Sequence, residues 1–298
     1  MPPGPSPSPV IWLSADQVSA DFSLPPGTAT EGRLPLAHAR VLVLVGLTGA
    51  GKTATVAALA GRGAVRAVLP DRRDITDRII LPAMTGDPSR TVTDRLERFR
   101  LTAAFRERHP GGMGDVLERL AIDADTGVGQ IGDGWMVFDG VRGPAEAAAA
   151  ARLPNAVFAV LLAPPELRVA RLCLRDDPFD RATQETDQEA GRIGRDDAAD
   201  PDYVHVLEEH GVGDLMSRSA VRRLARVLSD ASVDLGAVGS SSSIVVEESR
   251  YYDLAEALAV LNTLAPGRTV VADTSNNGID LVVDIVATAI NRPLGGAG

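Results

Sequence analysis

Short, unbroken apolar runs alternate with longer segments whose apolar residues recur every three or four positions over most of this chain. The unbroken runs predict strands buried on both faces of a sheet, at residues 41–45, 65–69, 135–138, 156–162 and 269–272. Helical spacing or Ala-rich composition predicts helices at residues 52–60, 90–108, 115–124, 144–152, 165–175, 252–265 and 279–290. Because strands and helices alternate, we expect an α/β fold in which a mostly parallel five-stranded sheet lies between two layers of helices.

The first 39 residues carry a weaker pattern. Residues 1–9 contain five Pro and predict an extended tail, and residues 10–13 have the composition of a short strand. Residues 14–39 contain a Pro-Pro-Gly break and show no clear periodicity. We therefore divide the chain into a tail and an unassigned segment at 1–39 and a main domain at 40–298.

The strand–helix alternation stops between residues 176 and 250. Residues 176–202 hold ten acidic and three basic residues, and residues 219–228 have the pattern of one amphipathic helix. The run Ser240–Ser243 predicts a loop. We expect residues 176–250 to form a helical, partly mobile insertion in the main domain.

A glycine-rich segment follows the first buried strand and precedes the first predicted helix. It reads Gly46, Leu47, Thr48, Gly49, Ala50, Gly51, Lys52, Thr53 and fits the Walker A pattern G-x-x-x-x-G-K-[S/T] at every fixed position. In such a phosphate loop the backbone N–H groups bind phosphates, the Lys reaches the β- and γ-phosphates, and the hydroxyl ligates Mg²⁺. We therefore predict that residues 46–53 bind ATP, with Lys52 catalytic and Thr53 a metal ligand.

The choice of basic residues supports this interpretation. Lys52 is the only Lys among 30 basic residues, and the others are all Arg. Arg replaces Lys on a solvated surface at little cost, but not where a compact ammonium on a flexible stem is needed. The same count excludes the Asn-Lys-x-Asp motif of guanine-specific GTPases, so we expect ATP to bind at least as well as GTP.

The overall composition narrows the class of protein. The chain has 298 residues and a formal net charge of −10, which argues against non-specific binding to nucleic acid or to an anionic membrane. One Cys excludes an internal disulfide framework, and no apolar run approaches the ~20 residues of a membrane span. There is no pattern of a secretory signal. We expect a soluble, cytoplasmic protein of unknown oligomeric state.

The segments after the phosphate loop resemble adenylate-kinase-like proteins, a family of P-loop nucleoside and nucleotide kinases. Residues 135–142, followed by a Pro at 144, resemble the third strand of that family, although the spacing Asp139-Gly140-x-Arg142 is one residue shorter than usual. Residues 156–168 resemble the fourth strand and the helix that leads to the lid, and residues 268–275 the last strand. The resemblance implies a P-loop NTPase three-layer sandwich with kinase activity. It also implies that Arg171 and Arg175, four residues apart on one helix face, cover the base and hold phosphates.

Two further residues have candidate roles in the chemistry. A carboxylate beside the phosphate loop, such as Asp139, can hold Mg²⁺ through water. The planar fork of Arg142 matches the oxygens of a transferring phosphoryl group. The plainer alternatives are an Asp that caps a turn and an Arg in solvent.

The acceptor is expected between the second and third strands, where residues 62–108 hold eleven Arg against seven acidic residues. Arg72 or Arg73 is a candidate for binding an acceptor phosphate or carboxylate. Asp71 or Asp74 is a candidate for accepting the proton of an attacking hydroxyl. The alternative is a charged surface loop with internal ion pairs.

Together these features predict an Mg²⁺- and ATP-dependent phosphotransferase that moves the γ-phosphoryl group to a small, anionic acceptor, a nucleotide or a phosphorylated metabolite. One alternative is a hydroxyl kinase for a nucleoside, a sugar or a cofactor precursor. Another is an ATP-binding regulatory or scaffold protein whose insertion contacts a partner. In the first two cases the insertion is expected to be a lid that closes through arginines such as Arg175.

Overall fold

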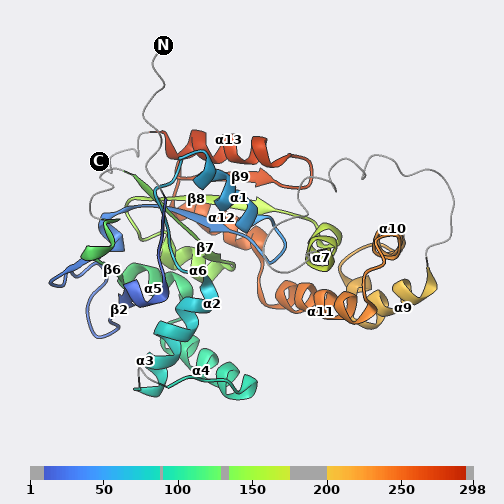
Figure 1. The fold of residues 1–298 in the computed structure, drawn as a ribbon, viewed down its shortest axis with the longest axis horizontal. Coiled ribbons are helices and arrows are strands. Elements are labelled where there is room, and N and C mark those ends of the chain that lie inside the picture. The colour runs from blue at the N-terminus through green and yellow to red at the C-terminus, as the bar shows by residue number, and fades with distance from the viewer. Residues whose placement is uncertain (1–9, 88–89, 129–133, 175–199, 293–298) are drawn as a thin grey trace, which may run out of the picture.

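A six-stranded sheet lies at the centre of the protein. The computed structural model describes residues 10–87, 90–128, 134–174 and 200–292. Every pair of neighbouring strands in the sheet is parallel, in the order β1-β5-β7-β4-β8-β9 (Figure 1). The strands are β1 (Ile11–Trp12), β4 (Arg40–Val45), β5 (Ala67–Val68), β7 (Trp135–Val141), β8 (Ala156–Leu162) and β9 (Thr269–Asp273). The prediction of five strands in this sheet is wrong by the edge strand β1: residues 10–13 have the composition of a short strand, but their sequence does not show that β1 pairs with β5.

Strand β4 separates two apolar cores, because successive side chains of a strand point to opposite faces. Val41, Val43 and Val45 belong to one core, and Leu42 and Leu44 belong to the other. Helices cover both faces (Figure 1), which confirms the three-layer α/β architecture. The first core contains residues of α5 (Met113–Arg119), α6 (Pro144–Ala150) and α12 (Leu254–Leu264), and the second those of α1 (Lys52–Gly61) and α13 (Ile279–Ile290).

A second, smaller sheet uses the N-terminal segment that shows no clear sequence pattern. It is antiparallel, in the order β2 (Val18–Ala20), β6 (Leu120–Asp123), β3 (Arg33–Pro35). The helix predicted over 115–124 is therefore wrong in its second half, since α5 ends at Arg119. The pairing partners of β6 come from about 90 to 100 residues earlier in the chain, a distance over which local sequence patterns carry no information.

A helical arm projects from the sheet beside β5 (Figure 1). It consists of α2 (Arg72–Ile75), a π-helical turn at Thr76–Ile80, α3 (Leu81–Thr85) and α4 (Arg95–Arg108). The helix predicted to begin at residue 90 begins at Arg95, because the Asp94 side chain accepts the N–H of Glu97 at 2.7 Å and caps it there. Short 3₁₀ turns lie at Ala15–Gln17, Leu36–His38, Ala124–Thr126 and Val212–Asp214.

A group of helices beside the sheet has an apolar core of its own. This helical unit comprises α7 (Pro165–Cys173), α9 (Pro201–Glu209), α10 (Arg218–Asp230) and α11 (Leu235–Tyr251) (Figure 1). The amphipathic helix predicted at 219–228 corresponds to α10. The loop predicted at Ser240–Ser243 is wrong, because these residues lie within α11, where Ser241 and Ser242 are buried. The small side chains let neighbouring groups come close: a Cβ on Gly239 would lie 2.6 Å from Nε2 of His210. Among the helices of the described ranges, none has the length and apolar character needed to cross a membrane.

Candidate functional site

The glycine-rich loop joins β4 to α1 and adopts a conformation that needs its glycines. Gly49 has φ of +83° and Gly51 has φ of +90°, in the left-handed region that side chains disfavour. A Cβ on Gly49 would also lie 2.8 Å from the carbonyl oxygen of Arg168. Gly51 is the N-cap of α1, so the helix begins directly at Lys52. Both glycines therefore allow a tight turn that ends at a helix N-terminus.

Lys52 folds back over this loop. Its Nζ donates hydrogen bonds to the carbonyl oxygens of Gly46 at 2.9 Å and Leu47 at 3.0 Å. Burial and the nearby charge of Arg142 lower the pKa of Lys52 to about 8, although Asp139 acts in the opposite direction. An ammonium with a lowered pKa would gain stability from any anion bound beside it.

Two arginines of α7 hold the loop from outside. The Nε of Arg168 donates to the carbonyl oxygen of Thr48 at 2.9 Å, and Nη1 of Arg171 donates to that of Gly49 at 3.2 Å. Arg171 also donates to Oγ1 of Thr274 at 2.9 Å and to its carbonyl oxygen at 2.8 Å, which ties the loop to the residue after β9. The structure thus places Arg171 against the loop, as a brace on its carbonyl side.

Four backbone N–H groups of the loop are not used by these contacts. In the part of the chain that the structure describes, none of the following backbone N–H groups has a hydrogen-bond acceptor: Gly49, Gly51, Lys52 and Thr53. Together with the helix dipole of α1, such groups form the kind of site that binds phosphate.

Asp139 lies beside the loop on a β-bulge. Along β4 and β7, Val43 pairs with Phe138 but Val45 pairs with Val141, so Asp139 and Gly140 together face one residue of β4. A Cβ on Gly140 would lie 2.2 Å from Cζ of Phe138, so only Gly fits there. The strand predicted to end at residue 138 therefore continues to Val141, and the bulge turns Asp139 out of the regular alternation.

The electrostatic surroundings of Asp139 connect it with the loop. Burial raises the pKa of its carboxyl group, Lys52 and Arg142 oppose this rise, and Asp71 adds to it. No other residue within the described ranges donates a hydrogen bond to the Asp139 side chain. A half-buried carboxylate whose donor is its own backbone N–H, in the field of an ammonium, is suited to binding a cation or a proton.

Glu248 of α11 is the site residue that sequence reasoning missed. Its Oε2 accepts the N–H of Thr48 at 2.8 Å and Nη2 of Arg168 at 2.9 Å. Its Oε1 accepts Oγ1 of Thr48 at 2.6 Å and Nη1 of Arg142 at 2.5 Å. Burial alone would raise the pKa of Glu248, but the charge of Arg142 and the bonds from Thr48 outweigh it and hold that pKa below its ordinary value. The carboxylate thereby joins the helical unit to the glycine-rich loop.

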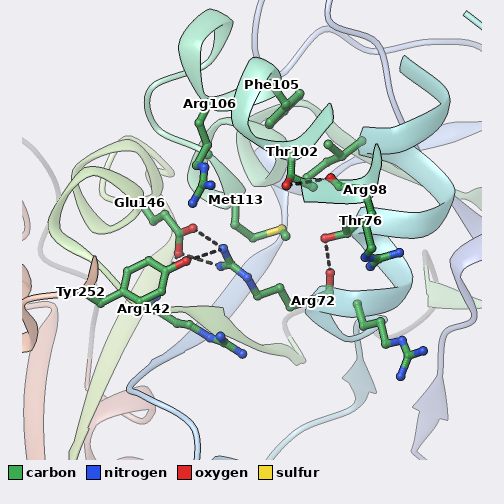
Figure 2. A pocket seen from close by; sticks show the side chains of 13 residues that line it. Arg72, Thr76, Arg98, Thr102, Phe105, Arg106, Met113, Arg142, Glu146 and Tyr252 are labelled. Atoms are coloured by element: carbon green, nitrogen blue, oxygen red, sulfur yellow. Dashed lines mark hydrogen bonds and ion pairs between the residues drawn. The ribbon is translucent and has the colours of Figure 1, made fainter. Parts of the chain in front are cut away.

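A cavity of about 290 Å³ lies between the helical arm and the end of β7 (Figure 2). Its lining includes the aromatic ring of Tyr252, the carboxylate of Glu146 and five arginines, which we call the cavity arginines: Arg72, Arg73, Arg98, Arg106 and Arg142. Figure 2 shows three of them, Arg72 of α2, Arg106 of α4 and Arg142 after β7, reaching into the cavity from different elements. The lining therefore concentrates positive charge in a protein whose net charge is −10.

Of the four residues predicted to bind the acceptor, two line this cavity. Arg72 is held by Glu146 through two bonds, of 2.8 Å and 2.6 Å, and the side chain of Arg73 is exposed. Asp71 caps α2 by accepting the N–H of Asp74 at 2.8 Å, and neither Asp is among the lining residues. The cavity thus contains the predicted arginines but not the predicted carboxylates.

The remaining cavity arginines differ in how far they are engaged. Arg98 is paired with Asp77. Arg106 has no hydrogen-bond or ion-pair partner among the described residues, and the Nε of Arg142 is buried without an acceptor. Arg106 is therefore open to an anion, and the Nε of Arg142 is a donor that the described residues leave without an acceptor. Arg175, predicted to hold phosphates, lies outside the described residues, as do residues 176–199 of the insertion that was predicted to be a lid.

Comparisons with known proteins leave the family open. No protein-family model matches the chain, and no curated protein matches it either. The functional argument therefore rests on the residues themselves.

Proposed function

We propose that the protein is an ATP- and Mg²⁺-dependent phosphotransferase that moves the γ-phosphoryl group to a small anionic acceptor. The observation that carries the proposal is the position of Arg142. Its side chain lines the arginine-rich cavity and is also linked through Glu248 to Thr48 of the glycine-rich loop. Arg142 is thus connected to both places and would contact a phosphoryl group that moves from the loop to the cavity.

The nucleotide would bind at the loop that carries the open N–H groups. Residues 46–53 would enclose the phosphates, and Lys52 would exchange its two carbonyl partners for the β- and γ-phosphate oxygens. Arg168 and Arg171 would keep the loop in shape, because they bind its carbonyl oxygens rather than its N–H groups. This division leaves the concave side of the loop to the ligand.

Two oxygen donors fit a nucleotide-bound metal. Mg²⁺ takes most of its ligands from phosphates and water and needs only one or two from the protein. The hydroxyl of Thr53, in the first turn of α1, and the carboxylate of Asp139 have the required chemistry. Bound Mg²⁺ would neutralise charge on the phosphates, and in return it would lower the pKa that burial raises at Asp139.

The acceptor would bind in the cavity. Five arginines and one carboxylate line it, an excess of four positive charges, and the partners Asp77 and Glu248 reduce this excess to two. Two remaining positive charges match an acceptor phosphate or a dicarboxylate. Arg106 and the Nε of Arg142 would supply the bonds, since neither donor has an acceptor in the described part of the chain.

Positioning and neutralisation of charge account for most catalysis of phosphoryl transfer. Lys52 and Arg142 would stabilise the charge on the moving group from its two sides.

One observation favours a second function. Glu248 fastens the helical unit to the loop, so that nucleotide binding could be transmitted to a surface of that unit. The second candidate is therefore a regulatory protein that changes its affinity for a partner with its nucleotide state.

The test is to measure ADP formation from Mg·ATP alone and with a panel of nucleoside monophosphates, sugar phosphates and dicarboxylates. A phosphotransferase is expected to form ADP at least ~10-fold faster with one of these acceptors than with water, since an ordered acceptor has a large effective concentration. Tight ATP binding with slow hydrolysis that no acceptor accelerates would reject the phosphotransferase and favour the regulatory protein.

A further inference from the structure

The carboxylate of Glu248 has no unused hydrogen-bonding capacity. A carboxylate offers about four lone-pair sites, and Glu248 fills them with two donors of Thr48, one of Arg142 and one of Arg168. It is also only 7 % exposed. A buried acceptor with all its sites filled has one orientation, and it imposes that orientation on its donors.

Among these donors, Arg142 is the one whose fixed orientation matters for the proposed chemistry. Glu248 takes its Nη1, while the backbone N–H of Arg142 donates to Oε2 of Glu146 at 3.0 Å. The guanidinium is planar and rigid, so fixing Nη1 also fixes the opposite edge, formed by Nε and Nη2. On that edge, Nε is buried without an acceptor. Burying an unpaired donor costs free energy, and an anion that binds the edge recovers it.

The end of α11 reaches both halves of the site. Glu248 contacts the loop, and Tyr252, four residues later at the C-cap of the helix, lines the cavity. The Tyr252 hydroxyl accepts a bond from Nη2 of Arg72 at 3.3 Å, and Figure 2 shows the ring beside the cavity arginines. One helix end therefore touches the nucleotide loop and the wall of the proposed acceptor cavity.

We propose that Glu248 is a positioning residue, which fixes Arg142 relative to the loop and presents the Nε–Nη2 edge to the group that is transferred. This inference rests on the proposed function. Glu248 itself does not touch the substrate: it acts through Arg142 and Thr48. The transfer step then depends on the docking of α11, although no residue of α11 takes part in the chemistry.

Two other roles of Glu248 make different predictions. If the carboxylate competes with phosphate for Thr48, removing its charge should tighten ATP binding. If it only stabilises the contact between α7 and α11, its removal should lower stability and leave the kinetics of the folded protein unchanged. A positioning role predicts a lower kcat at nearly constant affinity for ATP.

The test compares Glu248→Gln and Glu248→Asp with the matched control Glu247→Gln in the full chain. Glu247 precedes Glu248 on α11, is about half exposed and, among the residues that the structure describes, pairs only with Arg250. Glu248→Gln should lower kcat on the order of 10²-fold, because a small displacement of a catalytic group costs about that much, with the Kd for ATP within about threefold. Glu248→Asp should regain part of the loss, and Glu247→Gln should match the wild type.

A binding measurement without turnover separates this inference from the proposed function. Inorganic phosphate is titrated into each variant by calorimetry, and Glu248→Gln is expected to bind it about tenfold more weakly than the wild type, for the loss of one charge-assisted contact. In a protein that already carries Arg142→Lys, adding Glu248→Gln should weaken phosphate binding no further. This pattern supports the positioning role even if no acceptor is phosphorylated, an outcome that rejects only the proposed function.

Three results would overturn the positioning role. They are tighter ATP binding by Glu248→Gln, unchanged phosphate binding by Glu248→Gln, or a loss of phosphate affinity from Glu248→Gln that is equally large with Arg142 and with Arg142→Lys. Circular dichroism and thermal unfolding accompany each titration. If Glu248→Gln does not fold, the Glu248→Asp comparison decides, with a smaller loss of the same sign expected in kcat and in phosphate affinity.

Discussion

The glycine-rich loop and the arginine-rich cavity are both suited to bind anions, but they are built in opposite ways. The loop consists of eight consecutive residues, and its donors are backbone N–H groups with one charged side chain, Lys52. The cavity uses side chains from α2, α4, the end of β7 and the end of α11, most of which already have partners. A backbone site is sensitive to a Cβ at its glycines and to its single charge. A side-chain site has redundant charges, so each of its arginines should matter less, except Arg142, which is also linked to the loop through Glu248.

The largest effect is expected where the loop has no redundancy. Lys52→Ala should lower ATP turnover on the order of 10²–10³-fold, by analogy with the loss of a single transition-state donor. The fold should be retained, since within the described ranges Lys52 bonds only two carbonyl oxygens of its own loop. Steady-state kinetics and circular dichroism of both proteins measure this. Equal turnover with an intact fold would show that the loop is not the reactive half of the site.

The same contrast explains what the sequence could predict. The loop, β4, β8 and α13 follow from local patterns, because a buried strand, a left-handed glycine and a helix N-terminus are each specified by neighbouring residues. The small antiparallel sheet does not, since its strands pair across about 90 to 100 residues. The prediction of a loop at Ser240–Ser243 is wrong because a run of small polar residues is, on its own, typical of loops. In α11 small residues instead permit close packing of helices.

The cavity and Glu248 were harder to foresee for the same reason. An excess of Arg between residues 62 and 108 indicates a positive region, but it does not say which arginines are already paired. Arg72 is engaged by Glu146, which lies 74 residues away. Glu248 contacts the loop at Thr48, which lies 200 residues earlier in the chain. The helix that carries Glu248 has no sequence motif. Only the fold brings these charges together.

A moderate effect is expected in the cavity. Arg106→Gln should raise the KM for the anionic acceptor about tenfold and leave the Kd for ATP unchanged, because Arg106 lines the cavity with no partner among the described residues. Arg108→Gln, on the same helix and outside the cavity lining, is the matched control. A change in ATP affinity instead of acceptor KM would mean that the cavity belongs to the nucleotide.

The smallest expected effect is the uptake of protons by the protein when ATP binds. Burial lowers the pKa of Lys52 to about 8, so the free protein carries this ammonium below that pH and loses it above. A bound triphosphate favours the charged form and raises the pKa, so binding at pH 8 should take up about half a proton, and at pH 6 almost none. ATP affinity should correspondingly fall from pH 7 to pH 9.

Calorimetry in two buffers of different ionisation enthalpy measures the uptake, with Lys52→Ala as the control that abolishes it. Uptake that persists in Lys52→Ala would assign the proton to a group other than Lys52.

The central claim is that the loop and the cavity are two halves of one transfer site. Phosphorus NMR of Mg·ATP with an acceptor from the anion panel follows the γ-phosphoryl group directly. The account predicts that its signal moves to the acceptor, that transfer is faster than release of inorganic phosphate, and that Lys52→Ala and Arg142→Lys both abolish this preference. If the γ-phosphoryl group appears only as inorganic phosphate, at one rate with and without every acceptor, the two sites do not work together and the account is wrong.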